Sequence, residues 1–125
     1  MPKSSIALVF AILAGLPVPA LAVEGDYIVA GTNLDGSSYA GTAVIARTSD
    51  TTCAIEWTTG ASACKGICML EGDVLVASYV MSGVIGLVVY HLLNDGTLYG
   101  RWTTSGQDGS GIDILTPATP ANATK

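Results

Sequence analysis

The chain has 125 residues, of which 12% are charged, and its ten acidic residues against five Lys and Arg give a formal net charge of −5. This balance excludes a nucleic-acid-binding surface, because affinity for nucleic acid comes from clusters of basic residues. Sparse charge combined with abundant Gly, Thr, Val and Ala is typical of a β-protein with short turns and excludes a disordered chain.

The first 22 residues have the organisation of a secretory signal peptide. Lys3 precedes the apolar run 6–16, prolines follow that run, and Ala20-Leu21-Ala22 supplies the small-x-small pattern that a signal peptidase cleaves. The alternative, a membrane anchor, is disfavoured because the apolar run is too short to span a bilayer. We therefore expect an exported protein, periplasmic or secreted.

Short alternating runs rich in Val, Ile, Thr and Tyr follow, without a helical period. Turn signals interrupt them at the roughly 8–12-residue spacing of a sandwich or barrel. The pattern predicts an all-β fold, an eight-stranded antiparallel up-and-down meander that closes into a small barrel of lipocalin-like or avidin-like architecture. We expect the first strand (26–32) to pair with the last (111–116) and remove the sheet edges. The predicted domains are a signal peptide (1–22), the barrel (23–117) and a flexible tail (118–125).

The turn positions also predict which residues face the interior. Tyrosines fall opposite glycines three times, so that each ring covers bare backbone, in the pairs Tyr39–Gly31, Tyr79–Gly86 and Tyr90–Gly100. A narrow bore requires such alternation of large and small side chains. We expect the bore to be filled, with no cavity beyond a few waters, by Tyr39, Trp57, Tyr79, Tyr90 and Trp102.

All three cysteines lie in the segment 53–68. A two-residue turn at Gly60-Ala61 places Cys53 opposite Cys68 on one face, and Cys64 opposite Trp57. Strand rise separates Cys64 and Cys68 by about 13 Å, too far for one zinc ion, and no Cys-x-x-Cys redox motif is present. The register favours a Cys53–Cys68 disulfide formed after export. A Cys53–Cys64 pairing after a register slip, or three free thiols, remain alternatives.

The outer face of the fifth and sixth strands is more apolar than a soluble monomer usually tolerates. Three explanations are open: a second copy or a protein partner covers this face, the sheet folds so that both faces are buried, or the face touches lipid. The candidate partner surface consists of Val74, Val76, Val80, Ile85, Leu87 and Val89.

The sequence contains no recognisable catalytic, metal or cofactor site. The single histidine, His91, belongs to a strand without a flanking motif, and Asp35, Asp95 and Asp108 occupy turns for conformational reasons. The glycine-rich stretch 106–111 joins two strands without a helix, so it is no phosphate-binding loop. We expect a protein that is not an enzyme.

Five motifs in order, "YIVAGTNLDGSSYAG", "AIEWTTG", "LVVY", "DGTL" and "GRW", extend over the whole of the expected barrel. In these motifs the chain resembles a group of small exported bacterial β-barrel proteins, many uncharacterised and some labelled fibronectin-binding. The resemblance implies no catalytic residues, and the cysteines are not part of its pattern.

One function and two alternatives to it follow as hypotheses. The first is a non-catalytic binding or structural module that engages a protein or extracellular-matrix partner through the apolar face of the fifth and sixth strands, with homo-oligomerisation as a variant. The alternatives are a carrier for a small hydrophobic ligand of the lipocalin or avidin type, or an inhibitor of an envelope hydrolase. A carrier requires an open bore, which makes the interior the discriminating feature.

Overall fold

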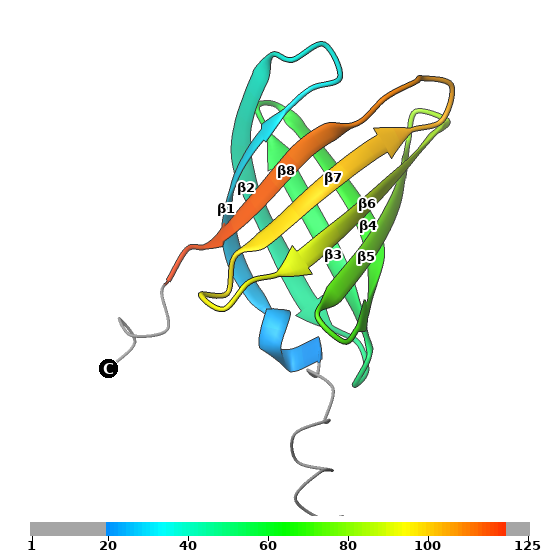
Figure 1. Cartoon of the computed structure of the whole chain (residues 1–125). Coiled ribbons are helices and arrows are strands. Elements are labelled where there is room, and N and C mark those ends of the chain that lie inside the picture. The colour runs from blue at the N-terminus through cyan, green and yellow to red at the C-terminus, as the bar shows by residue number, and fades with distance from the viewer. Residues whose placement is uncertain (1–19, 120–125) are drawn as a thin grey trace, which may run out of the picture.

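The computed structural model describes residues 20–119 and shows a closed barrel of eight antiparallel strands in chain order (Figure 1). The predicted fold is therefore confirmed. Residues 1–19 of the expected signal peptide and 120–125 of the expected tail lie outside the described residues. No helix within 20–119 is long and apolar enough to cross a membrane. The elements are η1 (Ala20–Val23), β1 (Gly25–Thr32), β2 (Ser38–Arg47), β3 (Thr52–Thr59), β4 (Ser62–Glu71), β5 (Val74–Met81), β6 (Val84–Leu92), β7 (Leu98–Thr104) and β8 (Gly111–Pro117).

The barrel closes through β1 and β8, as the sequence predicts. Val29 lies opposite Leu115 and Gly31 opposite Asp113 in this antiparallel pair. The pairing extends one residue past β8, where the Ala118 N–H donates to the Asp26 carbonyl at 2.9 Å. Every strand thus has a neighbour on both sides, and the first residue of the expected tail is held to the wall.

The predicted registers are also confirmed. Trp57 lies opposite Cys64 and Cys53 opposite Cys68, across a turn that Gly60 begins with a φ of 60°. Each tyrosine–glycine pair is present, and a Cβ atom added to the glycine would overlap the tyrosine ring. Glycine is therefore required for the rings to lie flat against the wall, in the pairs Gly31–Tyr39, Gly86–Tyr79 and Gly100–Tyr90.

Aliphatic side chains pack solidly in the half of the barrel nearest η1. The short helix lies across this end, close to the start of β1 (Figure 1), and its Val23 is completely buried. The Tyr27 hydroxyl donates to the Val23 carbonyl at 2.6 Å, and burial raises the pKa of Tyr27 to about 12. This half is a closed core whose fully buried members include Val29, Ile45, Ile55, Leu75, Leu98 and Leu115.

Candidate functional site

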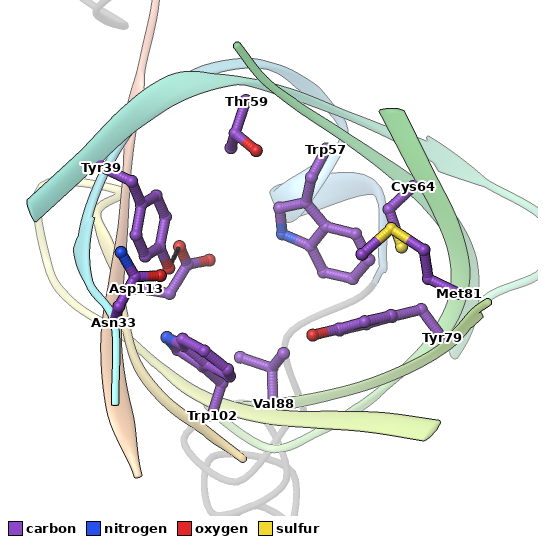
Figure 2. Close-up of a pocket in the computed structure, with 10 residues that line it drawn as sticks. All are labelled: Asn33, Tyr39, Trp57, Thr59, Cys64, Tyr79, Met81, Val88, Trp102 and Asp113. Atoms are coloured by element: carbon purple, nitrogen blue, oxygen red, sulfur yellow. Dashed lines mark hydrogen bonds between the residues drawn. The ribbon is translucent and has the colours of Figure 1, made fainter. Parts of the chain in front are cut away.

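The other half of the barrel contains an open cavity of about 210 Å³. Figure 2 shows its rings around a central opening, with Tyr39 and Trp102 on one side and Trp57 and Tyr79 on the other. Turn residue Asn33 and the strand ends at Thr59 and Met81 place its mouth at the end opposite η1. The lining comprises Asn33, Tyr39, Trp57, Thr59, Cys64, Tyr79, Met81, Val88, Trp102 and Asp113.

The expectation that aromatic rings fill the bore is wrong. The rings point inward as predicted, but they pair along the walls instead of meeting across the centre. Tyr39 and Trp102 form an edge-to-face pair with ring centroids 6.4 Å apart, and Trp57 and Tyr79 form another at 5.3 Å. A single water needs roughly 10–15 Å³ of such space, so this cavity exceeds a few waters. Of the five predicted interior residues, four line it and the fifth, Tyr90, is fully buried.

Asp113 lines the cavity and is the candidate-site residue that the sequence analysis missed. Asp113 lies in β8 and is only 3% exposed. Among the described residues it is the one polar or charged residue that is buried. Its Oδ1 accepts a hydrogen bond from the Tyr39 hydroxyl at 2.6 Å, and its Oδ2 accepts one from the Tyr90 hydroxyl at 2.5 Å. The Tyr90 oxygen in turn accepts from Trp57 Nε1 at 3.0 Å. The network joins β2, β3, β6 and β8 across the barrel.

Within residues 20–119 the Asp113 carboxylate has no cationic partner. The cavity lining contains no Lys, Arg or His. Within the described residues one ion pair is present, Arg47–Asp50, and it does not involve Asp113. Lys65 and Arg101 are exposed on the outside of the barrel. Desolvation raises the pKa of the Asp113 carboxyl, while the hydrogen bonds from Tyr39 and Tyr90 oppose that rise. Its neighbours stay neutral, because burial and the adjacent carboxylate raise the pKa values of both tyrosines.

We expect Asp113→Asn to change how stability depends on pH. A carboxyl whose pKa is higher in the folded protein than its unfolded value of 3.8 is protonated more readily when folded. Its contribution to stability is therefore full below the unfolded pKa and is lost as pH rises through the folded pKa. Thermal melts from pH 7 to pH 4 should show the parent gaining stability relative to Asp113→Asn. A difference in Tm that is constant with pH would contradict this assignment.

Two other lining groups offer chemistry to a bound molecule. The Tyr79 hydroxyl points into the cavity in Figure 2. Cys64 is half-buried and unbridged, and desolvation raises the pKa of its thiol, which keeps it neutral. The wall thus presents a phenol, a thiol and several ring faces around one carboxylate.

The disulfide lies away from the cavity. Cys53 and Cys68 are bridged, with Cα atoms 4.9 Å apart, which confirms the predicted pairing. Both residues are buried and pack into the closed core, at 2% and 5% exposure. The bridge therefore staples β3 to β4 and contributes nothing directly to the cavity wall.

The predicted partner surface is exposed except at Val74, which is half-buried. Val80 is 66% exposed and Ile85 is 55% exposed. All six predicted residues belong to the paired strands β5 and β6. The described residues do not bury both faces of this hairpin, so that explanation fails for the part of the chain shown. β4 extends the surface with Ile67 and Met69, which are 72% and 54% exposed and which the sequence analysis did not include. We call this surface the outer apolar face: Ile67, Met69, Val74, Val76, Val80, Ile85, Leu87 and Val89.

The remaining candidates have structural roles or lie in solvent. Asp35 accepts hydrogen bonds from the Ser37 N–H and hydroxyl, and Asp95 accepts one from the Thr97 N–H. These bonds stabilise the charged forms and lower both pKa values. His91 is exposed on the outer wall. No group of three or more His, Cys, Asp or Glu side chains that could hold a metal comes together in residues 20–119.

No protein-family model matches the sequence, and no curated protein is similar to it. Among solved structures the chain is similar to a redesigned β-barrel, with a TM-score of 0.65 and 20% identity over 81% of this chain and 96% of that one. It is also similar to a mutant of the fluorescent protein UnaG, with a TM-score of 0.54 and 14% identity over 79% of this chain and 98% of that one. At these identities the likeness establishes the fold alone. The chain belongs to the class of small closed antiparallel barrels, whose eight-stranded members can hold one small ligand.

Proposed function

We propose that this protein is a non-catalytic binding barrel that holds one small molecule in the aromatic cavity. The observation that carries the proposal is the contrast between the two halves of the bore. The half near η1 is solid, whereas the other half keeps about 210 Å³ open among inward-facing rings. Drug-sized pockets measure roughly 300–1,000 Å³, so the ligand is smaller than a typical drug.

The proposed place of action is an oxidising compartment outside the cytoplasm. Disulfides form and persist in such compartments, and Cys53–Cys68 is bridged. The signal-peptide pattern in residues 1–22 supports the same location, periplasmic or secreted.

Intrinsic fluorescence gives a direct test, because both tryptophans of the chain, Trp57 and Trp102, line the cavity. The purified oxidised protein is titrated with toluene, 3,3-dimethyl-1-butanol, choline and 3,3-dimethylbutanoate, which differ in charge but are all small. We expect at least one of them to change the fluorescence with saturation.

Val88→Phe and Val89→Phe form a matched pair for this test. Val88 lines the cavity and Val89 lies on the outer wall of the same strand. The first substitution should fill the cavity and abolish the fluorescence response, while the second should leave it unchanged. Val88→Leu covers the case in which the phenylalanine variant fails to fold. A response to none of the four compounds, or one that survives both Val88 variants, contradicts the proposal.

A second candidate function, engagement of a protein partner or a second copy, is favoured by the outer apolar face. Contiguous exposed apolar surface on a soluble protein commonly marks an interaction site. The resemblance to exported proteins labelled fibronectin-binding is in keeping with this role.

We expect Val76→Lys combined with Leu87→Lys to abolish self-association or partner binding without unfolding the barrel. Thr42→Lys combined with Thr58→Lys is the matched control, since these residues are paired and exposed on β2 and β3, outside the outer apolar face. Light scattering and pull-down are the measurements. Identical behaviour of the two double variants would show that the outer apolar face is not a contact surface.

A further inference from the structure

We infer that the ligand of the cavity is a small organic cation, such as an alkylated ammonium group. This inference rests on the proposed binding function and names the chemical class that the site selects. Two independent features carry it: a buried carboxylate without a counter-ion, and a wall of four electron-rich rings.

The charge argument begins with Asp113. Buried Asp residues in proteins are almost always paired, because desolvating an isolated charge is costly. At Asp113 the two phenols supply hydrogen bonds but no positive charge. The basic side chains of the described residues all lie on the outer surface: Arg47, Lys65, His91 and Arg101 are exposed. The interior therefore has an uncompensated negative charge next to an open space, and a cation in that space would supply the missing counter-charge.

The ring argument is separate from the charge. Tyr39, Trp57, Tyr79 and Trp102 surround the opening from two sides (Figure 2). Aromatic faces attract cations within about 6 Å of the ring centroid, most strongly at Trp, and aromatic cages are the usual receptors for quaternary ammonium groups. A cation can thus contact rings on several sides while it lies near the carboxylate.

Carboxylate geometry leaves room for this role. A carboxylate has about four acceptor sites, and the two phenols occupy two of them. An ammonium N–H could therefore bond Asp113 directly, whereas a fully alkylated ammonium would interact through its charge. A neutral ligand of the same shape would use the rings and gain nothing from Asp113. An anionic one would be repelled.

The test compares choline with its neutral carbon isostere, 3,3-dimethyl-1-butanol, and with the anion 3,3-dimethylbutanoate. Dissociation constants come from tryptophan fluorescence and are checked by calorimetry on the oxidised parent protein. We expect choline to bind about tenfold or more tightly than the neutral isostere, and the anion to bind most weakly. In Asp113→Asn, which has nearly the same shape, choline should lose its advantage while the affinity of 3,3-dimethyl-1-butanol stays within about twofold of the parent value.

Asp113→Glu is the second variant, used if the asparagine variant does not fold, and it should keep a preference for choline. Equal affinity for choline and its isostere in the parent overturns the inference and leaves the binding function standing. Preference for choline that persists in Asp113→Asn also overturns it, because the selectivity then does not come from the carboxylate. Binding of the neutral or anionic compound alone overturns it as well. If no compound binds, both the inference and the proposed function fail.

Discussion

Replacing Tyr90 with alanine should destabilise the barrel more than any other single truncation of its interior. Tyr90 is fully buried and links Asp113 to Trp57. Loss of a buried ring of this size costs about 3–5 kcal/mol. The substitution also leaves an Asp113 carboxylate oxygen and the Trp57 indole N–H without their hydrogen-bond partner, which adds about 1–3 kcal/mol to the loss of stability for each group. The sum is comparable with the whole stability of a domain, about 5–15 kcal/mol, so much of the variant should be unfolded at 37 °C.

Tyr90→Phe separates the ring from its hydroxyl. This variant keeps the packing and removes only the hydrogen bonds, so we expect a loss of about 1–3 kcal/mol for each stranded group. Urea denaturation followed by circular dichroism measures both variants. Equal losses for Tyr90→Ala and Tyr90→Phe would contradict the packing role that the structure gives to this ring.

The second large effect is expected from loss of the disulfide. Cys53 and Cys68 are separated by 15 residues, and closing a loop of this length stabilises a protein by about 3 kcal/mol in the chain-entropy model. A domain of this size loses about 4–8 °C of Tm per kcal/mol. The double variant Cys53→Ala and Cys68→Ala should therefore melt roughly 12–24 °C below the parent, as measured by calorimetry.

Cys64→Ala is the matched control for this measurement. It removes the third thiol, which is unbridged and only half-buried, so its melting temperature should remain close to that of the parent. The oxidised protein treated with reductant should reproduce the loss seen in the double variant. A drop as large in Cys64→Ala would show that packing in β3 and β4, not the bridge, sets their stability.

Strand order, registers and the disulfide were predictable from the sequence because each follows from turn positions, whereas closure followed from the need to remove the two sheet edges. Once Gly60-Ala61 is fixed as the turn, the two-residue periodicity of a strand determines that Cys53 meets Cys68. The same periodicity places Tyr39, Tyr79 and Tyr90 over glycines. These are local rules, and no distant part of the chain interferes with them.

Two features of the candidate site could not be obtained in the same way. Asp113 alternates with Gly111 and Leu115, which are also buried, so the periodicity of β8 contained a signal for its inward position. An Asp between two isoleucines is nevertheless more often assigned to solvent, because buried charge is rare. The cavity had no sequence signal, since its volume depends on how the rings orient against opposite walls. The outward positions of Ile67 and Met69 followed from the β3–β4 register but were overlooked.

The seam between β1 and β8 has a consequence for synthesis. Until residues 111–117 have emerged, β7 has no neighbour on one side and β1 lacks its second partner. A nascent chain stalled at that point would present two free edges, each able to template pairing with another molecule. The contacts that remove this hazard join the two extremes of the barrel sequence, and such distant contacts form slowly. Aggregation pressure on this protein should therefore be greatest in the interval before its last seven-residue strand becomes available.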